Sequence, residues 1–279
     1  METGRKIIVI VAAHKASEMP SDEMYLPLHV GAEGKTDDNG KPLDLGFQKD
    51  NTGDNISRLN PYFCELTGLY WVWKNLDADF IGLVHYRRLF TGKNLDSSDM
   101  ISSAITYDEI RPMLNTYRAF VPQKRNYYIE SLFSHYSHTH GKEHLDACRH
   151  IIKDKYPQYI PSYDKVLKRS WGYMFNMMIL EKDLLNKYCG WLFDILFELF
   201  DKVGLEGMSG FDARYCGRVA EILFNVWIEY MVSSGEIKRS EIKELPYMED
   251  VVWRVKIKSF LMAKFFHKNY SQSAASKKT

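Results

Sequence analysis

The sequence predicts an α/β domain, and three segments carry this prediction. Residues 6–13 and 80–84 are continuous apolar runs, which are typical of strands covered on both faces. Residues 60–75, between them, place aromatic and aliphatic side chains at helical spacing. A strand, a long connection, a helix and a second strand in this order form a Rossmann-like unit. We therefore expect a sheet flanked by helices.

Local signals set the expected bounds in the first half of the chain. The first strand ends at His14, and residues 15–59 are rich in Gly, Asp, Asn and Pro, which predicts a long functional loop. The helix is expected to begin at Asn60, a capping residue, with Pro61 at its first position and Asn75 near its end.

The second half of the chain predicts one more buried strand and a mainly helical C-terminal part. Residues 171–180 form a strongly apolar run that Asn176 interrupts. The other predicted elements are a short helix over 108–116, a strand over 119–121 ended by Pro122, and helices over 126–156, 182–203 and 211–232.

Charge is unevenly distributed along the chain. Seven Lys or Arg and no Asp or Glu lie after residue 250. Removing them from the 37 basic residues leaves 30 against 36 acidic residues, so residues 1–250 carry a net charge of −6. A weakly acidic body argues against a general nucleic-acid-binding protein, which needs a basic face. The composition, 26% charged and 45% hydrophobic, is that of a globular protein.

The sequence divides into a folded domain over 1–250 and a basic amphipathic tail over 251–279. The aromatic, aliphatic and lysine residues of 251–268 suit an anionic membrane surface, and they suit equally a helix that packs on the body. The last nine residues are predicted to be disordered. No signal peptide and no apolar run of about 20 residues is present, and the four cysteines show no pairing pattern. We expect a cytoplasmic protein with peripheral membrane contact.

The strand over 80–84 ends at a group of polar side chains. His85, Tyr86, Arg87 and Arg88 follow it at the carboxyl end, where α/β sheets bind ligands. Two adjacent guanidinium groups there suit a phosphate or pyrophosphate, whereas the alternative is a pair of solvated arginines at the end of an edge strand.

Two aspartates precede the same strand. The metal-binding Asp-x-Asp pair of nucleotide-sugar transferases would follow the apolar strand, but Asp77 and Asp79 come before Phe80 and are interpreted as a turn. Arg87 and Arg88 follow the strand, at the position where the metal ligands of those enzymes would lie. The sequence therefore predicts a diphosphate site that works without a metal ion.

Two other polar segments leave several interpretations open. Asp54 and Asn55 lie in a loop that can contact a ribose or sugar, cap the next helix, or bind calcium, although the ligand alternation of an EF-hand is missing. His140 and His144 share a helix face, but the order His-Gly-Lys-Glu-His does not match a zincin motif. Solvated or acceptor-facing histidines are favoured there over zinc ligands.

Five motifs of this chain lie at residues 25–31, 50–57, 65–75, 82–88 and 175–179. Together they resemble a bacterial family of capsular or exopolysaccharide glycosyltransferases of the GT-A superfamily, some of which are galactofuranosyltransferases, and the resemblance covers residues 6–232. It implies a GT-A-like, Rossmann-type mixed sheet flanked by helices. It also implies a UDP-sugar donor and a lipid-linked oligosaccharide acceptor. No cofactor or metal is expected.

The resemblance extends to a late Arg-x-x-Gly-x-x-x-Glu pattern formed by Arg214, Gly217 and Glu221. Ile222 stands where the family usually has a second Arg, so a role that depends on that Arg is not carried over.

Transfer with inversion needs a general base. Asp212 is the first choice, with Glu221 and His140 as alternatives, and Glu221 can instead be the buried partner of an arginine. The predicted donor and diphosphate site consists of His14, Asp54, Asn55, His85, Arg87, Arg88, Asn176 and Arg214. Two rival functions are a metal-dependent nucleotide-sugar hydrolase or phosphotransferase that uses Asp77 and Asp79, and a non-catalytic glycan-binding component of a capsule assembly complex.

Overall fold

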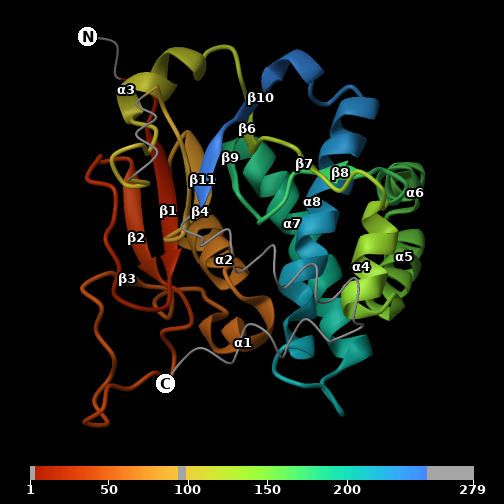
Figure 1. Ribbon diagram of the computed structural model, residues 1–279, viewed down its shortest axis with the longest axis horizontal. Coiled ribbons are helices and arrows are strands. Elements are labelled where there is room, and N and C mark those ends of the chain that lie inside the picture. The colour runs from red at the N-terminus through yellow and green to blue at the C-terminus, as the bar shows by residue number, and fades with distance from the viewer. Residues whose placement is uncertain (1–3, 94–98, 250–279) are drawn as a thin grey trace.

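The computed structural model describes residues 4–93 and 99–249, and these form a mixed α/β fold (Figure 1). Nine strands of the described residues form one sheet, in which seven run in the order β10-β6-β9-β4-β1-β2-β3, while β5 pairs with β4 and β11 pairs with β5. The strands are β1 (Ile7–Ala13), β2 (Tyr25–His29), β3 (Gln48–Lys49), β4 (Phe80–His85), β5 (Arg88–Phe90), β6 (Ala119–Pro122), β9 (Met178–Glu181), β10 (Ile242–Leu245) and β11 (Tyr247–Glu249). A separate pair is formed by β7 (Arg125–Asn126) and β8 (Trp171–Gly172).

The sheet is parallel around β1 and becomes mixed at β9. β1 pairs in parallel with both β2 and β4, whereas β9 runs antiparallel to β4 and β6. The predicted Rossmann-type mixed sheet is therefore confirmed. β1 and β4 are almost fully buried because their apolar runs face packed layers on both sides.

Eight α-helices accompany the sheet in the described residues, and α4–α8 gather on one side of it in Figure 1. None of the described helices is long and apolar enough to cross a membrane. The helices are α1 (Asn60–Phe63), α2 (Leu66–Asn75), α3 (Tyr107–Ile110), α4 (Leu132–His140), α5 (Glu143–Lys155), α6 (Ile160–Leu167), α7 (Lys182–Val203) and α8 (Tyr215–Ser233).

The predicted loop over 15–59 contains two strands. β2 pairs along its whole length with β1, from Val9 opposite Tyr25 to Ala13 opposite His29. β2 was not predicted as a strand because it contains Pro27, and proline is rare in paired strands. β10 and β11 were also missed, because each is short and partly exposed.

The predicted helix over 60–75 is interrupted. Cys64 has φ of 55°, which ends α1 and lets α2 begin two residues later. Asn60 is not the N-terminal cap, because it is already the first residue of α1 and Leu59 holds the capping position. Its Nδ2 instead donates to the Cys64 carbonyl at 2.7 Å and stabilises this break.

Two further predictions require correction. Residues 126–156 form two helices rather than one, because Gly141 at φ 79° separates α4 from α5. The apolar run 171–180 contains β8 and β9 with a turn between them, where Phe175 and Asn176 have positive φ. The interruption predicted at Asn176 is thus real. The tail over 251–279, with its predicted disordered end, lies outside the described residues.

Candidate functional site

His14 and residues 85–88 meet at the carboxyl ends of β1 and β4. The two strands are parallel neighbours, with Ala12 opposite His85. The Tyr86 N–H donates to the Ala12 carbonyl at 3.2 Å, and the rings of Tyr86 and His14 touch edge to face, with centroids 5.3 Å apart. The predicted strand-end cluster is therefore assembled at the edge where α/β proteins bind ligands.

Arg87 and Arg214 add positive charge beside His14. Arg87 is exposed, and its guanidinium lies 5.0 Å from the centre of the Tyr86 ring. Burial lowers the pKa of His14, and the charges of Arg87, Lys15 and Arg214 lower it further. Over residues 4–93 and 99–249, neither Arg87 nor Arg214 forms an ion pair with a carboxylate. Their charge is available to an anionic ligand.

Arg88 has a different environment from Arg87. Its Nε donates to Glu249 Oε1 at 2.8 Å, across the antiparallel pair of β5 and β11. Its guanidinium also lies 4.3 Å from the centre of the Phe175 ring. Arg88 is therefore held by an acidic and an aromatic partner, whereas its neighbour is exposed.

One side of α8, called here the α8 stripe, binds the segment that forms the turn between β8 and β9. Gly217, Glu221, Asn225 and Glu229 follow one another at intervals of four residues, so they lie along one side of the helix. Each of them binds a residue of the segment 169–176 through a backbone or side-chain group. The helix thereby fixes the backbone that leads into the site.

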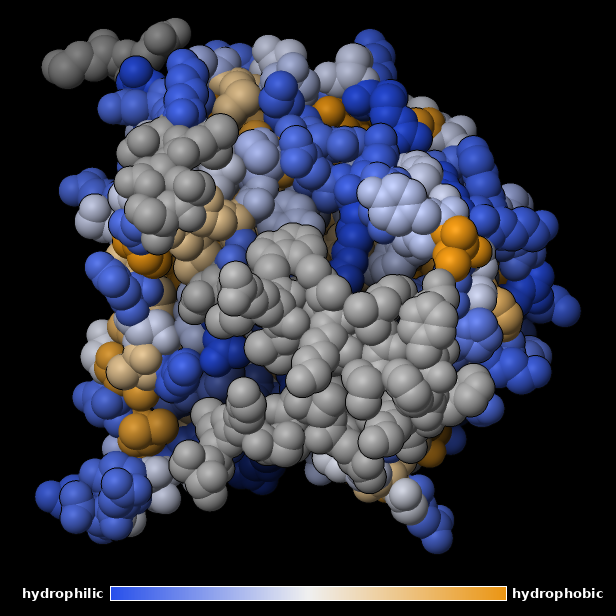
Figure 2. Space-filling model, in the orientation of Figure 1, coloured by the Kyte–Doolittle hydropathy of each residue, from blue (hydrophilic) through white to orange (hydrophobic). Residues whose placement is uncertain are grey.

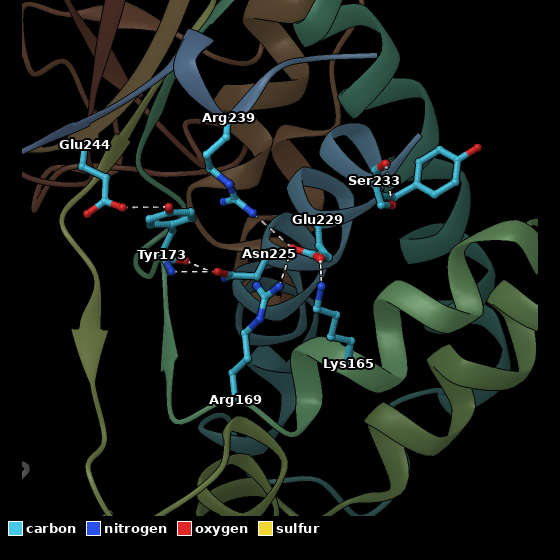
Figure 3. A network of polar contacts seen from close by, with 9 residues as sticks. Lys165, Arg169, Tyr173, Asn225, Glu229, Ser233, Arg239 and Glu244 are labelled. Atoms are coloured by element: carbon cyan, nitrogen blue, oxygen red, sulfur yellow. Dashed lines mark hydrogen bonds and ion pairs between the residues drawn. The ribbon is translucent and has the colours of Figure 1, made fainter. Parts of the chain in front are cut away.

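The far end of this stripe is a charge network (Figure 3). The buried Glu229 carboxylate pairs with Arg169 and with Lys165 at 2.5 Å, and Arg239 lies 3.5 Å away. Asn225 accepts from the Tyr173 N–H at 2.7 Å and donates to the Tyr173 carbonyl at 2.8 Å. This network anchors α8 against α6 and the strand that precedes the turn.

Asn176 occupies the near end of the stripe. Its Nδ2 donates to Glu65 Oε1 at 2.7 Å and to the Gly217 carbonyl at 2.9 Å. A side chain at Gly217 would meet Cys64, with 3.1 Å between Cβ and Sγ, so glycine permits this close approach. Asn176 Oδ1 is buried and has no hydrogen-bond partner among the described residues. This oxygen can accept a hydrogen bond from a ligand hydroxyl.

His85 lies behind the exposed cations. Its Nε2–H donates to the Phe175 carbonyl at 2.6 Å, since a carbonyl oxygen can only accept. Burial lowers its pKa, although the negative charge of Glu65 opposes this effect. The imidazole is thus neutral and holds the turn in place.

Glu221 combines a partly buried position with an altered pKa. Burial raises its pKa to about 7, and the nearby charge of Glu65 acts in the same direction. The Phe175 N–H donates to Glu221 Oε2 at 3.1 Å and, with Arg88 and Arg125, opposes part of this shift. A carboxyl group of this kind exchanges a proton near neutral pH. Glu65 was not singled out from the sequence, because only the folded structure brings it to Glu221 and Asn176.

The other two candidate bases differ from Glu221. Asp212 is exposed and accepts a hydrogen bond from Ser209 Oγ at 2.6 Å. His140 Nδ1 accepts from Arg218 Nη1 at 3.1 Å, and burial together with the charge of Arg218 lowers the His140 pKa to about 3. His140 is therefore neutral, with its other ring nitrogen carrying the proton.

Asp54 and Asn55 lie along α2. The Asp54 N–H donates to Asn75 Oδ1 at 3.1 Å, at the C-terminal end of that helix, and Tyr70 donates to its carboxylate at 3.2 Å. Asn55 accepts from the Ser57 N–H at 3.2 Å. These contacts place the loop at the helix end remote from Glu65, which precedes α2.

The two early aspartates stand at the amino end of β4, as the sequence indicated. Asp77 pairs with Lys182, and Asp79 Oδ2 accepts from the Lys6 N–H at 2.7 Å. Within the described ranges, no group of three or more His, Cys, Asp or Glu side chains is arranged to hold a metal ion.

Fold and site together define an α/β protein built like a glycosyltransferase. The chain resembles the apo structure of the bifunctional glycosyltransferase WbbM with a TM-score of 0.79 and 28% identity. The match covers 88% of this chain and 46% of that one, so the chain spans about half of the WbbM structure.

The chain belongs to the family described as domain of unknown function DUF4422, whose model matches residues 8–232. The family indicated by the sequence motifs and its mixed α/β fold are thus confirmed. The comparison with curated proteins finds no match.

Proposed function

We propose that this protein is a glycosyltransferase. It moves a hexose, such as galactose or galactofuranose, from a UDP-sugar to a growing capsular, exopolysaccharide or O-antigen oligosaccharide. The likeness to WbbM over 88% of the chain supports the reaction class. The acceptor is lipid-linked, and the protein works in the cytoplasm at the membrane surface.

The observation that carries the proposal is the positive charge beside His14, supplied by Arg87 and Arg214, neither of which has a carboxylate partner within the described part of the chain. Arg87 and Arg214 both act electrostatically on His14. A departing nucleoside diphosphate develops negative charge, and fixed guanidinium groups neutralise it without a metal ion. Arg88, tied to Glu249, supports the wall of this site through Phe175.

Glu221 is the proposed general base. Its pKa of about 7 lets it take the acceptor hydroxyl proton at neutral pH. Asp212, the first choice from the sequence, is exposed and lacks the burial that tunes a carboxylate for this task. Asn176 and the protonated ring nitrogen of His140 supply hydrogen-bonding groups for donor sugar or acceptor.

The first test follows UDP release from a panel of UDP-sugars in the presence of EDTA. Arg87→Ala is expected to lower turnover at least tenfold, or about 1.4 kcal/mol, because the leaving group loses a positive charge. Arg111→Ala is the matched control, since Arg111 is exposed on the short 3-10 helix that follows α3, away from the strand ends. Full activity in Arg87→Ala would remove the donor-site assignment.

The same assay separates the rival functions. A hydrolase or phosphotransferase that uses Asp77 and Asp79 with a metal would lose its activity in EDTA. A non-catalytic glycan-binding protein would bind glycan in calorimetry but would not bind UDP.

A further inference from the structure

The exposed large apolar side chains of the described residues gather around α4. There are four of them: Tyr128 at 87% exposure, Ile129 at 79%, Phe133 at 36% and Phe211 at 37%. The first two precede α4, Phe133 is in its first turn, and Phe211 contacts its last residue, His140, with ring centroids 5.7 Å apart. In Figure 2, one small hydrophobic group stands out among hydrophilic neighbours on the side of the molecule where α4 lies in Figure 1. We call these four residues together with α4 the α4 surface.

This surface adjoins the candidate site at both ends. Before α4, the guanidinium of Arg125 lies 5.4 Å from the centre of the Phe175 ring, and the Phe175 N–H binds Glu221. At the end of α4, His140 accepts from Arg218 of α8, which lies four residues after Arg214. The α4 surface is therefore linked to Glu221 through Arg125 and Phe175 at one end, and to α8 through His140 and Arg218 at the other.

A groove extends the surface away from the site. It lies between α4, α5 and α6, has a volume of about 560 Å³, and is lined by Phe133, Leu145, Tyr163 and Leu167 together with charged side chains. Arg149 and Asp164 at its edge are bound to each other through two hydrogen bonds of 2.8 Å. The volume lies within the range of small-molecule sites, about 300–1,000 Å³.

The chemistry of α4 selects the kind of ligand. Its nine residues, Leu-Phe-Ser-His-Tyr-Ser-His-Thr-His, include no Asp, Glu, Lys or Arg. The preceding Glu130 interacts with His135 and His138 at 3.1 Å each. An anionic membrane or a nucleic acid would require clustered Lys and Arg. Aromatic rings beside uncharged hydroxyl and imidazole groups instead suit a neutral sugar, whose C–H faces pack on rings while its hydroxyls form hydrogen bonds.

We propose that the α4 surface and its groove bind the neutral oligosaccharide part of the acceptor, with Tyr128 as a stacking platform. This inference rests on the proposed function and deepens it, because it assigns the acceptor side of the same site. Tyr128 suits this role because its ring is almost fully exposed, while its backbone, at φ 58°, is held by the surrounding turn.

The experiment uses the full chain and neutral tetrasaccharides of galactose, glucose and mannose as probes. Binding is measured by saturation-transfer NMR for wild type and for Tyr128→Ala. At least one tetrasaccharide is expected to bind wild type, and Tyr128→Ala is expected to weaken that binding at least threefold. Tyr117→Ala, at a partly exposed tyrosine that packs on Phe120 of β6, is the matched control and is expected to bind as wild type does.

Two outcomes overturn the inference: no tetrasaccharide binds wild type, or Tyr128→Ala binds the glycan as tightly as wild type. Binding of phosphatidylglycerol vesicles that Tyr128→Ala abolishes would also overturn it, because it would assign the surface to a membrane. UDP affinity is measured on the same samples and is expected to be unchanged in both variants. Glycan binding without UDP binding by wild type would defeat the proposed transferase function while leaving the glycan surface in place.

Discussion

The adjacent arginines illustrate what a residue's sequence context can and cannot predict. The strand end before Arg87 and Arg88 was recognisable from the apolar run and its polar boundary. The sequence left open whether the pair binds a ligand or only ends a strand. The structure separates the two residues, since Glu249, 161 positions later, binds Arg88, whereas Arg87 has no carboxylate partner among residues 4–93 and 99–249. A partner so distant in the chain gives no local signal.

At Glu221 we predict a pH profile set by its pKa. The carboxyl group must be ionised to accept a proton, and its pKa is about 7. The value of kcat/KM for sugar transfer is therefore expected to rise with pH through about 7. Glu221→Gln removes the titrating group and is expected to lower kcat at least a hundredfold, within the range of general-base effects. The measurement is the pH dependence of UDP release.

Asp212→Asn provides the comparison for that prediction. Asp212 is exposed and bound to Ser209. The Asp212→Asn variant is therefore expected to keep the turnover of wild type and the same rise of kcat/KM with pH. A variant of Asp212 that loses activity while Glu221→Gln retains it would return the role of base to Asp212.

Among the helices, α8 is expected to hold the backbone of the turn at Phe175 and Asn176 in its conformation through hydrogen bonds. Asn225→Ala would leave the Tyr173 N–H and carbonyl without their partners in a buried position. Each such group costs about 1–3 kcal/mol, so the free energy of unfolding is expected to fall by several kcal/mol. Urea denaturation of the purified protein measures this loss.

Ser233→Ala is the matched control on the same helix. Its hydroxyl is exposed and, among the described residues, donates to the Tyr230 carbonyl alone, so its removal is expected to change stability by less than about 0.5 kcal/mol. Equal stability of the two variants would show that the stripe of α8 does not hold the turn.

Element ends were the least predictable feature of this fold. The apolar runs gave β1, β4 and α7 nearly to the residue, because periodicity and burial are local properties of a sequence. The break at Cys64 was missed, and the interruption of the 171–180 run was predicted at Asn176 but not at Phe175, because Cys64 and Phe175 adopt positive φ against their own preference. Contacts from elsewhere in the chain, including Arg214 to Cys64 at 3.1 Å, accompany these conformations.

For the whole molecule, the sheet and the layered arrangement were predictable, but the composition of the site was not. His14 and residues 85–88 could be placed because carboxyl ends of parallel strands meet at one edge. Glu65, which precedes α2, joins the site by accepting a hydrogen bond from Asn176 and through its charge, which acts on Glu221 and His85. Such a cluster depends on how three separate elements pack, and no spacing in the sequence encodes it.

The distribution of charge leads to a prediction for the complete chain. Residues 1–250 carry −6, and the seven Lys and Arg beyond them carry no accompanying Asp or Glu. An anionic membrane repels the net negative charge of residues 1–250. It attracts the basic residues of 251–279, by about 1 kcal/mol for each Lys or Arg near the surface. The full chain is therefore expected to sediment with phosphatidylglycerol vesicles, whereas a chain truncated after Asp250 is expected to stay in the supernatant.

Salt provides the internal control for this measurement, since the Debye length falls from about 10 Å at 0.1 M to about 3 Å at 1 M. Binding by the full chain is expected to weaken strongly over that range if the lysines and arginines cause it. A truncated chain that still sediments would contradict the prediction, because the body would then hold a membrane site of its own. The uncharged α4 offers no such site, so membrane attachment and acceptor recognition are assigned to different parts of the chain.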